Sequence, residues 1–96
     1  MIQNCIEGRV ASINATGDLV TDITNERLQD IGDASQSKIK VGDHETIGIF
    51  SPDHGEPDGT LIAIEGPSGF LEIGITGMNI SEMLGLKPPQ TVMISW

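Results

Sequence analysis

Apolar and polar residues alternate in short runs along most of the chain, and glycine-rich turns separate the runs. Alternation with a period of two is typical of β-strands that bury one face. In the run 45–50, Ile47 and Ile49 are therefore expected to face the core together. The run 60–65 is apolar on both faces, which indicates a central strand. The pattern predicts about seven strands, over residues 6–14, 19–23, 38–41, 45–50, 60–65, 70–75 and 91–96.

The first two runs are expected to pair as a hairpin. The turn between them, at residues 15–18, contains Gly17 followed by Asp18, and such a pair between two apolar runs signals a β-hairpin. The alternation in the first run slips between Val10 and Ile13. This slip predicts a β-bulge or a strong bend in the first strand.

Two segments carry the signals of short helices. Residues 25–31 are expected to form one helical turn that ends at Gly32. Residues 79–84 are expected to form a second short helix, with Asn79 as its N-cap and Gly85 as its end.

The remaining pattern decides the fold class. Residues 51–59 hold two prolines and two glycines, so they are expected to form an exposed loop. No alternation of strands with long helices is present, which argues against a doubly wound nucleotide-binding fold. We predict an all-β fold: a small closed or partly open barrel of mostly antiparallel strands with one or two short helices, formed by residues 1–96 as a single domain.

Composition and charge limit the possible partners. The only aromatic residues are Phe50, Phe70 and Trp96, so the core is thin and burial against a second subunit is a natural expectation. The net charge is −9, with 14 acidic and 5 scattered basic residues. Nucleic acid and anionic membranes need clustered positive charge and are poor candidates.

The compartment is expected to be the cytoplasm. Cys5 is the lone cysteine, which fits a reducing environment because no internal disulfide can form. No apolar run approaches the roughly 20 residues of a membrane span. The first residues lack the basic flank and apolar stretch of a signal peptide.

No residue pattern marks a catalytic, metal or cofactor site. His54 lies in an acidic loop whose spacing does not match a calcium-binding loop, and this loop is expected to be solvated. Nucleophile-elbow and phosphate-binding motifs are absent from the sequence. The turn glycines Gly17 and Gly69 could present backbone N–H groups to a ligand, or they could simply form tight turns.

Three segments, in order along the chain, resemble the motifs of one known family. They are residues 8–10 with 17–23 (GRV and GDLVTDI), 66–73 (GPSGFLEI) and 79–86 (NISEMLGL). The corresponding family motifs read G-x-V with F-G-N-L-x-T-N-I, then G-S-x-G-Y-L-E-I, then N-x-A-x-x-L-G-L. On these motifs the chain resembles the C-terminal domain of the S-adenosyl-L-methionine hydroxide adenosyltransferases, relatives of the bacterial fluorinating and chlorinating enzymes.

The resemblance implies a small β-barrel that assembles as a homotrimer. In that family the adenosyl ligand lies between the N-terminal domain of one subunit and the C-terminal domain of its neighbour. The residues that activate water or halide belong mostly to the N-terminal domain. We therefore expect this chain to act as a stand-alone domain without catalytic residues, metal or cofactor of its own.

The resemblance also suggests which residues could hold a ligand. Thr16 and Asp18 stand where the family has an aromatic residue and an amide, and Pro67 stands where it has a serine. A carboxylate in place of an amide loses two N–H donors and adds a charge, so the pattern favours a retained fold over retained chemistry. The candidate ligand-binding residues are Thr16, Gly17, Asp18, Ser68, Gly69 and Phe70.

Three functions are compatible with these features. The leading one is a non-catalytic domain that acts by homo-oligomer assembly and by binding a nucleoside or S-adenosylmethionine-type ligand. The second is one subunit of a split adenosyltransferase that is completed by a separate N-terminal-domain protein. The third is an acidic module that docks a basic protein partner.

Overall fold

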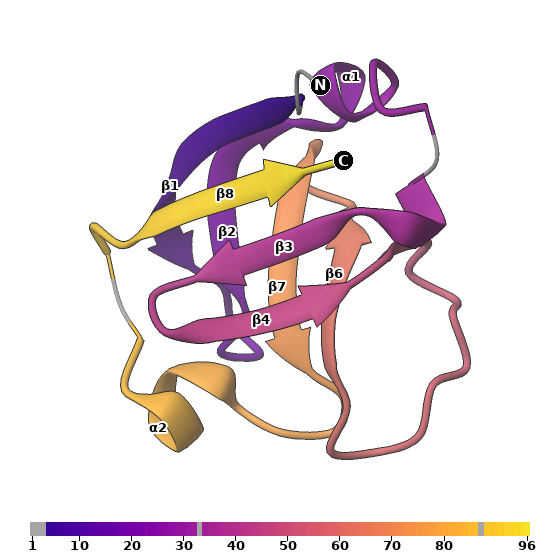
Figure 1. Ribbon diagram of the computed structural model, residues 1–96. Helices are drawn as coiled ribbons and strands as arrows, with labels where there is room; N and C mark the ends of the chain where they lie inside the picture. Colours follow the sequence, from indigo (N-terminus) through magenta and orange to yellow (C-terminus); the bar gives the residue numbers. More distant parts are fainter. Residues whose placement is uncertain (1–3, 33, 87) are drawn as a thin grey trace.

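Eight strands and two short α-helices make up the part of the chain that the computed structural model describes, which is residues 4–32, 34–86 and 88–96 (Figure 1). The strands are β1 (Cys5–Ile13), β2 (Leu19–Thr24), β3 (Lys38–Val41), β4 (His44–Ile47), β5 (Ile49–Phe50), β6 (Leu61–Glu65), β7 (Phe70–Ile75) and β8 (Thr91–Ser95). The helices are α1 (Asn25–Leu28) and α2 (Ile80–Leu84), with one 3₁₀ turn, η1 (Ala34–Gln36).

The strands form one curved sheet that nearly closes into a barrel. Their order is β4-β3-β8-β1-β2-β7-β6-β5, and neighbours are antiparallel except for the short parallel pair β5–β6. The β4 edge approaches the opposite end of the sheet where the Thr46 hydroxyl of β4 donates to the Leu61 carbonyl of β6, the neighbour of the edge strand β5, at 2.9 Å. Figure 1 shows β3, β4 and β8 on one side and β2, β6 and β7 behind them. The predicted all-β barrel is confirmed.

The predicted strand over residues 45–50 is wrong, because the chain breaks at Gly48. This glycine has φ of 94°, a left-handed conformation that ends the strand alternation. β4 before it pairs with β3, and β5 after it crosses to β6. As a result Ile47 is 57% exposed, while Ile49 packs partly against the core. The two isoleucines do not face the core together.

The predicted bulge and hairpin are confirmed. The pairing of β1 with β2 shifts between Val10 and Ser12, so the bulge lies where the alternation slips. In the turn, the Asn14 N–H donates to the Asp18 carbonyl at 3.0 Å and the Gly17 N–H donates to the Asn14 carbonyl at 3.0 Å. Gly17 has φ of 86°, which a residue with a side chain adopts only at a cost.

The helices begin and end on local signals. The Asn79 side chain accepts from the Glu82 N–H at 3.1 Å, and Gly85 ends α2 with φ of 67°, as predicted. In α1 the Thr24 hydroxyl accepts from the Arg27 N–H at 3.3 Å. This helix ends at Leu28, before the expected stop at Gly32. No helix among the described residues is long and apolar enough to cross a membrane.

Aliphatic side chains from alternate strand positions fill the barrel. This interior is the core, and it is the main source of stability because it removes apolar surface from water. Its fully buried members include Leu19, Ile23, Ile39, Leu71, Ile73, Ile80, Val92 and Ile94.

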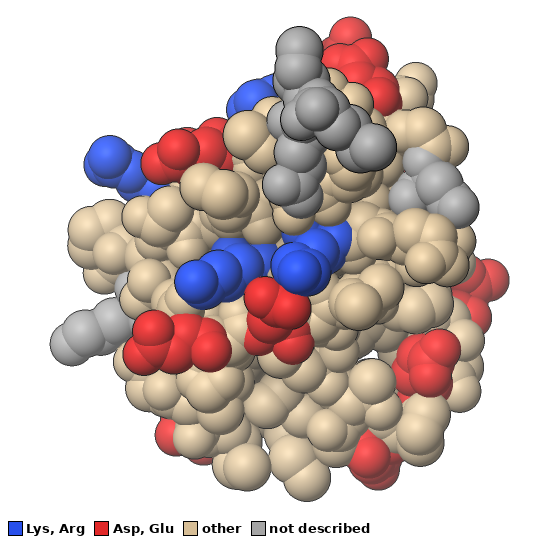
Figure 2. Space-filling model, in the orientation of Figure 1, with Lys and Arg blue, Asp and Glu red and all other residues tan. Residues whose placement is uncertain are grey.

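The outer face of β3 carries positive charge with acidic groups beside it. Lys38 and Lys40 point outward from this strand, and the Lys38 ammonium lies 3.8 Å from the Glu45 carboxylate of β4. Figure 2 shows basic side chains in the middle of this face with acidic side chains adjoining them. Exposed pairs of this kind contribute little to stability.

Replacing Gly17 by alanine is expected to destabilise the fold. The added Cβ would collide with the Asn79 side chain, and φ of 86° is unfavourable for alanine. We expect the free energy of unfolding to fall by roughly 1–3 kcal/mol, measured by urea denaturation. Gly32→Ala is the matched control, because no atom lies within 4 Å of a Cβ built there. Equal stabilities of the two variants would contradict this account of the turn.

Candidate functional site

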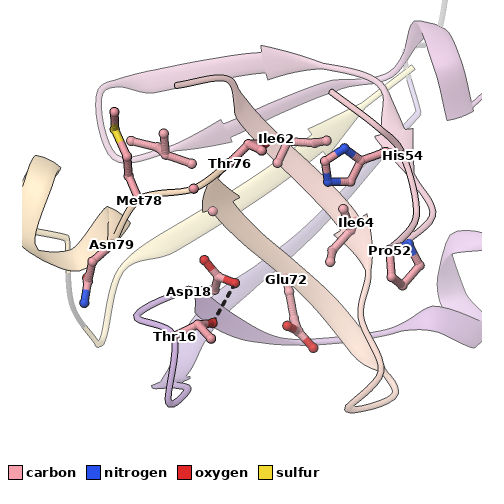
Figure 3. A pocket seen from close by; sticks show the side chains of 13 residues that line it. Thr16, Asp18, Pro52, His54, Ile62, Ile64, Glu72, Thr76, Met78 and Asn79 are labelled. Carbon is pink, nitrogen blue, oxygen red and sulfur yellow. Dashed lines mark hydrogen bonds between the residues drawn. The ribbon is translucent and has the colours of Figure 1, made fainter. Parts of the chain in front are cut away.

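A pocket of about 620 Å³ lies on the outer face of the β6–β7 strand pair. The register pairs Ile62 with Gly74 and Ile64 with Glu72, and these four residues line the pocket. Residues directly opposite each other in an antiparallel pair project to the same face. The second apolar face of the run 60–65 is therefore the floor of a pocket (Figure 3). Ile62 is only 5% exposed, yet it lies outside the core cluster of the barrel.

Three segments that are distant in sequence form the walls of the pocket. The β1–β2 turn contributes Thr16 and Asp18, and the 51–59 loop contributes Pro52 and His54. The segment after β7 carries the remaining lining residues. They are Ile75, Thr76, Gly77, Met78 and Asn79. Figure 3 shows Asp18 and Glu72 on one side of the pocket and His54 with Ile62 and Ile64 on another.

Glu72 is a buried carboxylate that is held at both oxygens. It is 4% exposed. Its Oε1 accepts from Asn14 Nδ2 at 3.2 Å, and its Oε2 accepts from the Ser68 hydroxyl at 2.8 Å and the Ser68 N–H at 3.3 Å. A Cβ at position 66 would collide with this carboxylate, so Gly66 leaves the space it occupies. These contacts fix Glu72 in the pocket wall.

Asp18 is the second carboxylate of the pocket. Its Oδ2 lies 3.1 Å from the Thr16 hydroxyl, and a Cβ at Gly74 would collide with its carboxylate. Burial raises the pKa of Asp18, and the nearby Glu72 charge raises it further, while hydrogen bonds from Thr16 and Asn14 act in the opposite direction. Asp18 is therefore harder to ionise than an exposed aspartate.

Asn14 connects the two carboxylates. Its Oδ1 accepts from the Asp18 N–H at 3.0 Å and the Thr16 N–H at 3.0 Å, and the Thr16 hydroxyl lies 2.8 Å away. Its Nδ2 donates to Glu72. These bonds assign the orientation of the amide, because the acceptor must face the turn and the donor must face Glu72.

His54 is half-buried in the pocket wall, although its loop is mostly exposed as predicted. Its Nδ1 accepts from the Glu56 N–H at 2.9 Å, so a neutral ring carries its proton on Nε2. The ring centroid lies 6.4 Å from that of Phe50. The loop is mostly exposed, as expected, and within it His54 is partly buried where it lines the pocket with Ile62 and Ile64.

The structure brings together only some of the sequence-predicted site residues. Thr16 and Asp18 line the pocket, and Gly17 lies buried in the same turn. Ser68 does not line the pocket, but its hydroxyl donates a hydrogen bond to Glu72, which does.

The other two predicted residues lie elsewhere. The pocket lies near one end of the β2–β7 pair, where Leu19 pairs with Ile73. Phe70 pairs with Thr24 at the other end of this pair. Gly69 precedes Phe70 at that end, and neither lines the pocket. Binding of a ligand by any of the six residues stays a prediction.

Metal ligands do not cluster here. Across the ranges that the structure describes, no group of three or more His, Cys, Asp or Glu side chains is placed to hold a metal ion.

Comparisons with known proteins identify the family. The model of the SAM hydroxide adenosyltransferase C-terminal domain matches residues 8–93. The chain therefore belongs to this family, and the resemblance of its motifs is confirmed. A search of curated proteins found no match.

Solved structures share the fold. An uncharacterized conserved protein from Thermotoga maritima superposes with a TM-score of 0.77 at 22% identity, over 98% of this chain and 37% of that protein. A conserved hypothetical protein from Thermus thermophilus gives 0.69 at 22% identity, over 92% of this chain and 32% of that protein. The chain thus spans about a third of the length of both.

Asp18→Asn is expected to stabilise the protein at neutral pH. Because the folded state raises the pKa of Asp18 above 3.8, the ionised carboxylate costs stability that the protonated form does not. The stability of the variant relative to the parent should therefore increase as pH rises through the raised pKa, and the difference should be smallest below pH 3.8.

Urea denaturation at pH 7 and at pH 3 measures this difference. Asp30→Asn, at an exposed aspartate outside the pocket, controls for the change in net charge. A pH-independent difference between Asp18→Asn and the parent would contradict the assigned burial of Asp18.

Proposed function

We propose that this domain binds an adenosyl-type nucleoside in the pocket on β6 and β7 and does not catalyse a reaction by itself. One observation carries the proposal. Thr16 and Asp18, which occupy the positions of the family's ligand-contacting turn but differ from it in residue type, line the pocket. The family match over residues 8–93 includes this turn within the matched domain.

The size and lining of the pocket suit such a ligand. Small-molecule sites occupy about 300–1,000 Å³ and combine apolar walls with a few polar groups. Ile62 and Ile64 offer an apolar surface for a flat base. Asp18, Asn79 and His54 offer hydrogen-bonding groups around it. In the family, the residues that activate water or halide belong mostly to the N-terminal domain, so we assign binding without catalysis to this one.

Calorimetry with adenosine and with S-adenosylmethionine tests ligand binding. We expect measurable binding at millimolar ligand, and Ile64→Ala should weaken it roughly tenfold because apolar contact with the ligand is lost. Ile47→Ala is the matched control, since Ile47 is 57% exposed on β4 and does not line the pocket. No heat with either ligand would contradict nucleoside binding.

We further propose that the chain assembles as a homotrimer, as the family resemblance implies. Three large apolar side chains remain exposed near the α2 end of the barrel and would be covered in an assembly: Ile13, Met78 and Met83. Multi-angle light scattering on the purified chain should give the mass of three copies. A monomer at all accessible concentrations would contradict assembly and leave ligand binding in place.

A second candidate function is one part of a split S-adenosylmethionine hydroxide adenosyltransferase. Two observations favour it: the family model that matches residues 8–93 is that of a C-terminal domain, and Met78, which lines the pocket, is 44% exposed. Hydrolysis of S-adenosylmethionine should then require an added N-terminal domain of the family. Hydrolysis by this chain alone would show that the non-catalytic assignment is wrong.

A further inference from the structure

We propose that the outer face formed by β3, β8 and β1 pairs with the same face of a second copy of this chain. The pair has a two-fold axis along β8, with Met93 at its centre. On each side of the centre, Lys40 of one copy forms an ion pair with Glu7 of the other. This inference does not depend on the proposed function. It follows from the register of the three strands, from the distribution of charge and from a hollow beside Met93.

The three strands place a basic, an apolar and an acidic side chain in one row across this face. Lys40 of β3 pairs with Met93 of β8, and Met93 pairs with Glu7 of β1. Residues directly opposite each other in antiparallel strands project to the same face, and all three side chains are exposed. Because neighbouring strands lie about 4.8 Å apart, Lys40 and Glu7 lie at similar distances on opposite sides of Met93.

This row is complementary to itself. In a symmetric pair of identical subunits, one surface contacts the same surface of the other subunit. A two-fold axis that runs along β8, between two facing copies, keeps Met93 opposite Met93 and exchanges the strands on its two sides. Lys40 of each copy then lies opposite Glu7 of the other. Two ion pairs therefore flank one central apolar contact.

The charge of the chain favours contact through this face. The net charge is −9, and a net charge far from zero keeps copies of a protein apart. Three of the five basic residues, Arg9, Lys38 and Lys40, point outward from β1 and β3 (Figure 2). Lys38 has an ion pair with Glu45, whereas Lys40 and Glu7 have none with any described residue. The charges of Lys40 and Glu7 are therefore available to a second copy.

A hollow beside the central methionine gives the face a shape that a second copy can fill. It has a volume of about 230 Å³ and lies beside β3 and β8. Its lining residues are Lys40, Gly42, Gln90, Thr91 and Met93. Met93 is 39% exposed, and methionine is flexible enough to fill irregular gaps. Met93 of each copy can enter the hollow of the other, which removes apolar surface from water.

The pairing face is separate from the exposed apolar side chains of the proposed trimer, which are Ile13, Met78 and Met83. We expect the pairing to be weak, because complementary charges at an interface contribute to specificity and association rate more than to affinity. It should appear as a reversible association that increases with protein concentration. Added salt should weaken it, because salt screens exposed ion pairs.

Charge-reversed variants test the pairing by sedimentation velocity at low salt. Lys40→Glu would bring carboxylates together and Glu7→Lys would bring ammonium groups together, so neither variant should pair with itself. An equimolar mixture of the two variants should pair, because position 40 of each again faces an opposite charge at position 7 of the other. We expect the mixture to associate at least about tenfold more tightly than either variant alone.

Two exposed positions outside the face supply matched controls. Arg27→Glu and Asp30→Lys make the same changes in net charge, and each should associate as the parent does. Circular dichroism should show the parent fold in all four variants. Lys40→Glu should also leave the proposed three-copy mass in place, which separates this pairing from the trimer.

Three outcomes would overturn the proposal. The first is a parent chain whose mass does not increase with concentration at low salt. The second is self-association of Lys40→Glu or Glu7→Lys as strong as that of the parent, and the third is a mixture of the two that does not associate. Binding of polyglutamate to a parent chain that does not pair, lost in Lys40→Glu, would assign the face to an acidic partner instead.

Discussion

The buried carboxylate of Glu72 is the constraint on which the geometry of the pocket depends. A charge that is 4% exposed must be hydrogen-bonded, and its partners come from two separate turns, through Asn14 and Ser68. Gly66 must lack a side chain to leave it space. One carboxylate therefore sets the position of the β6–β7 turn, the orientation of the Asn14 amide and, through that amide, the turn that carries Asp18.

Much of the fold could be predicted because its signals are local. The strand over residues 38–41, the bulge after Val10 and the caps of α2 all depend on residues close together in the sequence. The break at Gly48 could not be predicted in this way. A glycine is compatible with a continuing strand, and only the pairing of β4 with β3 and of β5 with β6 decides that the chain crosses there.

The site could be predicted less completely because its parts come from distant segments. Thr16 and Asp18 were found through the family motif, and both line the pocket. His54 could not be found, because nothing in the sequence of its loop indicates that it lines a pocket together with Ile62 and Ile64. One signal was present: the run 60–65 is apolar on both faces. This pattern correctly predicted a central strand, since β6 lies between β7 and β5. The second apolar face of the same run is the floor of the pocket, which the pattern alone did not reveal.

Consecutive residues of β6 and β7 face opposite sides of the sheet, one side toward the core and the other toward the pocket. Ala63 and Ile73 pair on the core side, whereas Ile62 and Ile64 line the pocket. A change in the pocket floor therefore leaves the barrel interior filled, and a change in the interior leaves the floor in place. The residues that face the pocket can therefore change as related proteins evolve, while the residues that face the core keep the barrel folded.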